Sequence, residues 1–200
     1  MRKFARLPAP QAFQENATQW TEQWLANYRK KSSFTWYQKD GKNAREWALP
    51  VLKEMTQGHC SFCDGFPLDA QTNEPIEHFR PKDTDNESFA TLAYKWDNLY
   101  YCCDNCNTTK GKKWEDGLIA ADEHDYQFSN YFIYDFEIGQ ISPNPTASPP
   151  MQARAETTIR LYGLDDQSHR TRRRLELLKY GKTSHKIIDD WAYRDFLEPI

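Results

Sequence analysis

Aromatic residues repeat with helical spacing near the start of the chain. Trp20, Trp24 and Tyr28 recur every four residues, and this spacing places the three rings on one face of an α-helix. It predicts a helix over residues 10–31. A continuous aromatic face of this kind is typical of packing surface rather than of a ligand site.

A second helix is predicted from Asn43 to Met55. Asparagine is a favoured N-cap because its side chain accepts a hydrogen bond from a free N–H of the first turn. Pro50 lies inside this segment and is expected to kink or interrupt the helix, since proline has no N–H to donate. Gly58 is expected to end it. The preceding segment, residues 32–43, is predicted to be a loop.

Strand-like alternation appears only later in the chain. Aromatic and polar residues alternate over 131–136, Gly139 follows as a turn residue, and a second short run ends at Pro143. This pattern predicts a β-hairpin or an extended segment. The proline-rich stretch over 142–150 is expected to be a rigid connector.

The remainder of the chain is predicted to be helical from its start and stop residues. Ser148 with Pro149 is a typical start, and Gly163 is a typical stop. Gly181 is expected to end the second-last helix and so to separate it from the last one. The three predicted helices run from Pro149 to Gly163, from a cap at Asp165 or Asp166 to Tyr180, and from Ser184 to Leu197.

Composition indicates a folded protein without a strong charge bias. The 200 residues are 38% hydrophobic and include seven tryptophans, with a formal net charge of −3. Nucleic-acid binding would therefore depend on a local basic patch. No apolar run approaches the roughly 20 residues that span a bilayer. Residues 1–13 lack the apolar core of a secretory signal, so we expect a cytoplasmic protein.

One local basic patch is present near the end of the chain. Arg170, Arg172, Arg173 and Arg174 lie within five residues of one another. Such a cluster can bind nucleic acid or an acidic partner surface. It can equally form a solvated helix face, and the sequence favours neither interpretation.

The cysteines fall into two tight pairs with the same spacing. Cys60 and Cys63 form one C-x2-C pair, and Cys103 and Cys106 form another, with residues 64–102 between them. A two-residue spacer lets a tight turn direct both thiolates at one ion, and two such turns complete the tetrahedral shell of zinc. Four thiolates leave no open position. The pattern therefore predicts a structural zinc site.

Two other interpretations of the cysteines are weaker. The pairs could be buried in a reduced core, which leaves their common spacing unexplained. A thiol-disulfide enzyme would need a thioredoxin-like strand and helix around one pair, and none is predicted. Cys102 would give a C-x3-C spacing and is expected to be a small buried residue outside the site. His59 is a weaker candidate ligand.

The insert between the cysteine pairs resembles the HNH nucleases of the ββα-metal kind. The resemblance covers roughly residues 58–113 and consists of Glu77-His78 before a proline, Asn98-Leu99, the two cysteine pairs, Asn107 after the last cysteine, and Lys110 three residues further on. It implies a hairpin that presents the histidine and a helix that presents the last asparagine.

The resemblance also implies roles for these side chains. His78 would be the general base, Glu77 and Asn107 ligands of a catalytic divalent ion, and Asn98 a structural brace. Two positions depart from the commoner pattern: Glu77 stands where aspartate is more frequent, and Asn107 where histidine is more frequent. These departures leave the reach of Glu77 and the choice of metal open.

The chemistry of phosphodiester hydrolysis agrees with such a site. A neutral imidazole suits deprotonation of water at physiological pH. A hard cation, Mg²⁺ or Mn²⁺, held by carboxylate and amide oxygens, stabilises the leaving oxygen. Arg80, Lys82 and Lys110 are predicted to meet phosphate oxygens. A histidine beside a glutamate can also be a satisfied core residue, and an HNH-like fold can serve only as a zinc-stabilised binding module.

The residues of these motifs, together with the later segment "TIRLYGLDD" and the arginines after it, resemble those of the HNH effectors of Septu and retron-associated anti-phage systems. This resemblance implies a PtuA-like ATPase partner, DNA or tRNA as substrate, and contact with retron RNA or DNA through the complex. The expected fold is α+β, with a helical region over 1–57, an HNH module over 58–125, and a short β segment with helices over 126–200.

Overall fold

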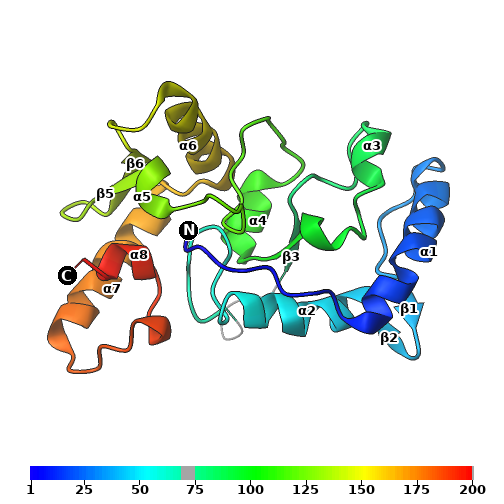
Figure 1. Ribbon diagram of the computed structural model, residues 1–200, viewed down its shortest axis with the longest axis horizontal. Helices are drawn as coiled ribbons and strands as arrows, with labels where there is room; N and C mark the ends of the chain where they lie inside the picture. Colours follow the sequence, from blue (N-terminus) through cyan, green and yellow to red (C-terminus); the bar gives the residue numbers. More distant parts are fainter. Residues whose placement is uncertain (69–74, 200) are drawn as a thin grey trace.

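A computed structural model describes residues 1–68 and 75–199. Helices predominate, and the strands of the described residues form three separate two-stranded antiparallel sheets, so the fold is mixed α+β (Figure 1). The elements in chain order are α1 Gln11–Tyr28, β1 Gln38–Lys39, β2 Lys42–Asn43, α2 Ala44–Met55, β3 Ile76–His78, α3 Glu87–Ala90, β4 Leu99–Tyr101, α4 Asp104–Lys110, α5 Phe128–Tyr131, β5 Phe132–Asp135, β6 Gln140–Pro143, α6 Pro149–Tyr162, α7 Gln167–Lys182 and α8 Arg194–Leu197, with 3₁₀ turns at Trp96–Asn98 and Ile188–Asp190.

The first helix has the extent and the buried face that its aromatic spacing predicts. Phe13, Trp20 and Trp24 are buried on one side of α1, and the rings of Phe13 and Trp20 meet edge to face with centroids 5.6 Å apart. Tyr28 lies at the last turn and donates a hydrogen bond to the carbonyl oxygen of Thr84 over 2.6 Å. The helix is therefore a packing element, as expected.

The second helix starts at the predicted cap but is not interrupted by its proline. The Asn43 side chain accepts from the N–H of Glu46, whose carboxylate accepts from the N–H of Asn43 in return. The helix continues through Pro50 to Met55, so the expected interruption is wrong, while the alternative expectation of a kink stays a prediction. The missing N–H removes a single intrahelical bond, and burial of one helix face outweighs that loss. Gly58 follows in a left-handed conformation, with φ +78°.

The segment predicted as a loop before α2 contains a minimal hairpin. Residues 38–43 include β1 and β2, which pair antiparallel, with Asp40 and Gly41 in the left-handed region at the turn. An Asp-Gly turn between two short extended runs is a hairpin signal. The other half of the segment carries Phe34 and Trp36, which pack against the core.

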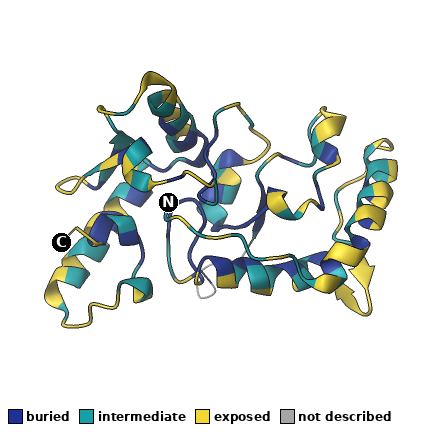
Figure 2. Ribbon diagram, viewed as in Figure 1, coloured by how far each residue is buried: buried dark blue, intermediate teal, exposed yellow. Residues whose placement is uncertain are grey.

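The centre of the molecule is a short hairpin followed by a helix. β3 pairs antiparallel with β4, with His78 opposite Leu99 and Ile76 opposite Tyr101. Every residue of both strands is buried (Figure 2). Cys103 then caps α4, because its sulfur accepts from the N–H of Cys106 over 3.4 Å. Between the two strands the chain passes through α3 and the 3₁₀ turn at Trp96–Asn98, and α4 follows directly after β4.

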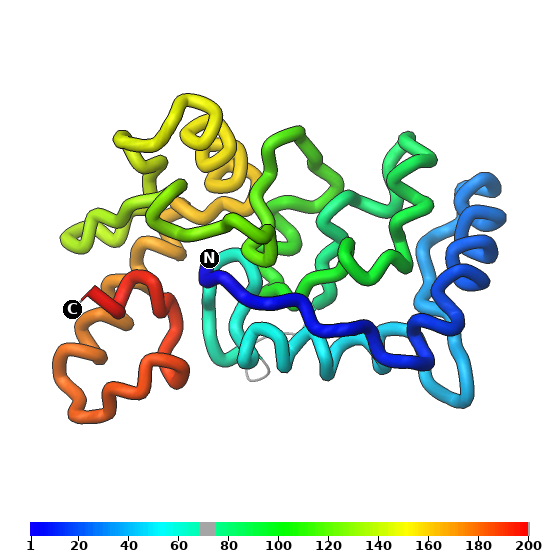
Figure 3. The backbone as a smooth tube through the Cα atoms, viewed as in Figure 1, coloured from blue at the N-terminus to red at the C-terminus, as the bar shows by residue number. Residues whose placement is uncertain are grey.

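An extended N-terminal segment, residues 1–10, lies along the middle of the molecule before α1 begins (Figure 3). Arg6 holds it in place. Its guanidinium donates to the carboxylate of Asp122 over 2.6 Å and to the carbonyl oxygen of Trp96 over 2.8 Å. The guanidinium group also lies over the ring of Tyr100, with its central carbon 4.4 Å from the ring centroid.

The predicted hairpin and the helix after it are confirmed. β5 and β6 pair antiparallel around Gly139. This glycine has φ +70°, and a Cβ there would lie 2.5 Å from the carbonyl oxygen of Arg170, so a larger residue does not fit. Helix α6 begins at Pro149 and ends at Gly163, whose φ of +62° is the left-handed cap expected from the sequence.

The last part of the chain differs from its prediction. Gly181 does not break α7, which is capped by Asp166 and extends to Lys182. The expected helix over 184–197 is wrong, because this region holds only a 3₁₀ turn and the four-residue α8. Tertiary contacts determine its path: the N–H of Tyr193 donates to the carbonyl oxygen of Asp64 over 2.8 Å. A long helix would remove that contact.

Candidate functional site

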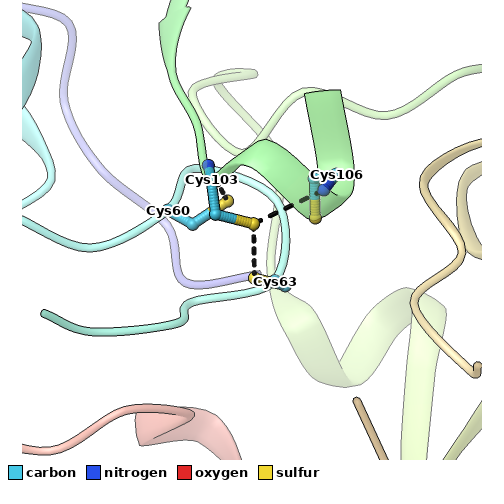
Figure 4. A group of neighbouring side chains, drawn as sticks. All are labelled: Cys60, Cys63, Cys103 and Cys106. Atoms are coloured by element: carbon cyan, nitrogen blue, oxygen red, sulfur yellow. Dashed lines mark hydrogen bonds between the residues drawn. The ribbon is translucent and has the colours of Figure 1, made fainter. Parts of the chain in front are cut away.

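The four predicted cysteines converge at the start of α4 (Figure 4). Cys60, Cys63, Cys103 and Cys106 are buried, and their sulfur atoms all lie within 4.8 Å of one another. The sulfurs of Cys63 and Cys103 are 3.7 Å apart. Zinc–sulfur bonds of about 2.3 Å in a tetrahedron separate the sulfurs by about 3.8 Å. The cluster therefore has the spacing of a four-thiolate metal site, and a metal ion such as zinc would fit it.

Backbone groups around the cluster favour thiolates. The N–H of Cys103 donates to the sulfur of Cys60 over 3.4 Å, and the N–H of Gly65 donates to that of Cys63 over 3.3 Å. Such bonds compensate negative charge on sulfur. The first turn is also tied to β4, since the N–H of Ser61 donates to the carbonyl oxygen of Tyr101 over 2.9 Å. The donor set and its surroundings fit zinc.

The two other candidate ligands, Cys102 and His59, do not belong to this group of four. The thiol of Cys102 is fully buried, donates to the carbonyl oxygen of Cys103 over 3.3 Å and also contacts the side chains of Cys60, Cys103 and Cys106. The ring of His59 stacks on Phe66, with centroids 4.3 Å apart, and its Nε2 lies 3.1 Å from the carbonyl oxygen of Trp191. His59 is therefore a satisfied core histidine.

Two residues near the cluster were not predicted from the sequence. His169 of α7 places its Nε2 4.0 Å from the sulfur of Cys106, while its Nδ1 lies 2.9 Å from the carbonyl oxygen of Gly163. Arg194 of α8 binds the buried carboxylate of Asp64, the residue after Cys63, over 2.7 Å. His169 contacts a cysteine of the cluster and Arg194 contacts the residue after one, both from far along the chain, so no local sequence pattern indicates them.

Glu77, His78 and Asn107 line one pocket beside the cysteine cluster. Its volume is about 320 Å³, and Lys82 forms part of its wall. β3 contributes the glutamate and the histidine, and α4 contributes the asparagine. The short hairpin and the capped helix therefore bring together three of the side chains that the motif named.

His78 is held in one orientation by its neighbours. Its Nε2 lies 2.9 Å from the carbonyl oxygen of Ala93, and its ring stacks on Trp36 with centroids 5.4 Å apart. A carbonyl oxygen can only accept, so Nε2 carries the proton and Nδ1 keeps a free lone pair. Burial, with the positive charge of Lys82 beside it, lowers the pKa of His78 well below its usual value. The imidazole is neutral.

Glu77 is paired inside the protein rather than open to solvent. Its carboxylate accepts from the ammonium group of Lys110, which also donates to the carbonyl oxygen of His78 over 3.1 Å. Burial raises the pKa of Glu77 to about 7, against the opposing effect of the Lys110 charge. Lys110 is fully buried. The predicted contact of Lys110 with phosphate is therefore corrected: its ammonium group is buried and paired with the Glu77 carboxylate.

Asn98 connects the two segments that flank His78. Its side-chain oxygen accepts from the N–H of Arg80 over 2.7 Å, and its amide donates to the carbonyl oxygens of Arg80 and Leu92, each over 3.0 Å. Leu92 directly precedes Ala93, which binds the His78 ring. Asn98 thus ties the chain after β3 to the turn that orients the histidine.

The remaining predicted cations are dispersed. Arg80 is exposed, stacks on Trp114 at 5.0 Å and lines a different pocket. Lys82 lies at the His78 pocket, where burial lowers its pKa. In the arginine cluster of α7, Arg173 is buried and donates to the carbonyl oxygen of Gly139 over 2.9 Å. That cluster is therefore only partly a solvated helix face.

Comparisons with known proteins relate the chain to one protein over part of its length. It is 33% identical over 73 residues to the Septu protein PtuB of Bacillus mycoides (strain KBAB4), covering 32% of this chain and 24% of that protein. It is also 33% identical over 69 residues to the Septu protein PtuB of Bacillus thuringiensis, covering 32% and 25%. The matched part spans about a quarter of these relatives. No protein-family model matches the chain. None of the helices in the described ranges is long and apolar enough to cross a bilayer.

Proposed function

We propose that this protein is a metal-dependent endonuclease of the HNH, ββα-metal kind that acts in Septu anti-phage defence. The similarity to PtuB supports the defence role. The observation that carries the chemistry is the single pocket lined by Glu77, His78 and Asn107. The order β3, β4, α4 around a four-cysteine cluster supports the HNH fold.

His78 acts as the general base. Because its Nε2–H is donated to Ala93, its Nδ1 is the atom that accepts a proton from the attacking water. The lowered pKa keeps that nitrogen unprotonated at physiological pH. Asn98 is a positioning residue, since its bonds to Leu92 and Arg80 hold the segments on either side of the ring.

Glu77 and Asn107 supply oxygen donors for a divalent ion, Mg²⁺ or Mn²⁺. Carboxylate and amide oxygens are the hard ligands that these ions prefer, and both side chains border the same pocket. When bound, such an ion stabilises negative charge on the leaving oxygen. Lys110 anchors the Glu77 carboxylate beside that position. Lys82 lies at the pocket wall and can meet a phosphate oxygen of the substrate.

We infer that the partner is a PtuA-like ATPase and that the substrate is DNA or tRNA, in the cytoplasm. The cysteine cluster holds a structural zinc ion with no open position, so it takes no part in hydrolysis. Its contribution is to fix α4, and with it Asn107, against β4.

A second candidate function is a zinc-stabilised binding module without activity. The burial of His78 against Trp36 and the pairing of Glu77 with Lys110 favour it. It predicts that substitutions of His78 or Asn107 leave defence against phage unchanged.

The test is cleavage by the purified protein in complex with its ATPase partner. The complex is incubated separately with duplex DNA and with total tRNA, each with Mg²⁺ or Mn²⁺. We expect one substrate to be cut, and the His78→Ala complex to leave both intact. If the two complexes behave identically on both substrates under conditions that activate defence, the binding module is the correct function.

A further inference from the structure

A second cavity adjoins the proposed nuclease pocket. It has a volume of about 600 Å³, and both cavities share Asp83 and Lys112 in their walls. It lies between the segment that follows α1 and the segment that precedes α3. This volume is within the range of small-ligand sites, and none of the roles proposed above uses it.

Aromatic rings form the inner side of this cavity. Trp24, Tyr28 and Phe34 line it, and the Phe34 ring lies 5.1 Å from the Trp24 ring and 5.3 Å from the His78 ring, centroid to centroid. The Phe34 ring, which meets the His78 ring edge to face, thus lies between the cavity and the proposed general base. A group bound against Tyr28 and Phe34 would lie next to the nuclease pocket.

The charges of the cavity cancel. Arg29 is paired with Glu87 over 2.6 Å, and Lys112 is paired with Asp83 over 3.0 Å. The other two charged residues in the wall, Lys31 and Asp85, have opposite signs. A phosphate would gain little there. The Lys82 ammonium lies over the Phe34 ring at 4.8 Å, on the side of the nuclease pocket. The positive charge that can attract a phosphate therefore lies in the nuclease pocket and not in this cavity.

From this arrangement we propose that the cavity binds a nucleobase of the nucleotide adjoining the scissile phosphate. The base stacks against Tyr28 and Phe34 while its phosphate lies at Lys82. A base inside a duplex is stacked on its neighbours and cannot enter. The substrate class is therefore nucleic acid with an unpaired nucleotide at the cleavage point, as in a single strand, a loop or a flipped-out position. This inference rests on the proposed nuclease function.

Binding to full-length His78→Ala protein tests it, because that variant does not consume the probe. The probe is a fluorescein-labelled 12-nucleotide single strand, compared with the same strand annealed to its complement and with a strand carrying one abasic position. We expect the single strand to bind at least tenfold more tightly than the duplex. Tyr28→Ala should weaken that binding about fivefold to 150-fold, while Tyr28→Phe, which keeps the ring and loses the hydroxyl, should not.

The parent protein should bind the abasic strand as weakly as the Tyr28→Ala variant binds the intact strand. Combining the abasic strand with the Tyr28→Ala variant should weaken binding no further. Equal affinity for single strand and duplex, with no effect of Tyr28→Ala, would overturn the base site and leave the nuclease proposal standing. Equal losses in Tyr28→Ala and Tyr28→Phe would show that the ring is not the platform. A loss in Lys31→Ala with a shallower salt dependence would show a phosphate site instead. No binding to any probe would overturn the base site, while the nuclease proposal is decided separately by the cleavage test on the complex.

Discussion

The ammonium group of Lys110 meets the carboxylate of Glu77 where the two side chains are 0% and 4% exposed. An isolated charge in such surroundings is strongly destabilising, whereas a hydrogen-bonded pair is tolerated. The pair joins β3 to the last turn of α4. It therefore fixes the strand that carries His78 against the helix that carries Asn107.

Replacing Lys110 alone should destabilise the protein more than replacing both partners. Lys110→Met leaves the Glu77 charge buried without its partner, and we expect the free energy of unfolding to fall by about 3–5 kcal/mol. Urea denaturation without added divalent ions measures it. Lys110→Met combined with Glu77→Gln should recover part of the loss. Strictly additive losses would show that the two groups do not interact.

His78→Ala should abolish turnover without unfolding the protein. A general base contributes about 10²–10⁴-fold to rate, and the cleavage rate of the complex should fall by that factor. Zinc content and the circular dichroism spectrum should stay at their original values. His185→Ala is the matched control, because His185 is half exposed and paired with Asp190 far from the pocket. A comparable rate loss in the control would argue against a specific role for His78.

Zinc content should separate the two neighbouring cysteines. Cys103→Ser removes a metal ligand but keeps a side chain that can cap α4. We expect loss of the metal and of most of the folded structure, because ligand binding supplies folding energy. Cys102→Ser should retain one zinc per chain, since Cys102 is not one of the four cysteines whose sulfur atoms converge. Elemental analysis by mass spectrometry checks both variants. Equal loss of zinc from the two would mean that the ligand has been misassigned.

Asn98→Ala should lower both stability and activity. Three backbone groups lose their partner, and leaving such groups unsatisfied costs about 1–3 kcal/mol each when water does not replace the bond. We expect a total of about 2–4 kcal/mol in thermal or urea unfolding. Gln127→Ala, at an exposed position, should change stability by less than about 0.5 kcal/mol. If the Asn98→Ala complex cleaved at the original rate, Asn98 would not be a positioning residue for His78.

Local signals predicted much of this fold. The capping residues Asn43 and Asp166, the glycine stop at Gly163 and the hairpin around Gly139 each act within a few residues, so the sequence displays them directly. The cysteine cluster was predictable for the same reason. Each C-x2-C pair is a local turn, and only the meeting of the two turns is long-range.

Features that depend on distant partners were missed. From its place in the motif, Lys110 was predicted to contact phosphate. In the structure it pairs with Glu77, which lies 33 residues earlier, and the pair is buried in the core. The segment after α7 has helical composition, yet Arg194 binds Asp64, 130 residues away, and keeps it irregular. Phe34 comes from a stretch that reads as a loop. Its ring reaches His78 only because the folded chain returns there.

The most direct test of the nuclease site is the position of a bound divalent ion. Crystals of the full-length His78→Ala protein soaked in Mn²⁺ would be measured near the manganese absorption edge. We expect one anomalous peak about 2.1 Å from a carboxylate oxygen of Glu77 and from the side-chain oxygen of Asn107, in the pocket that both line. A peak bound elsewhere, with these two side chains free of metal, would contradict the proposed site.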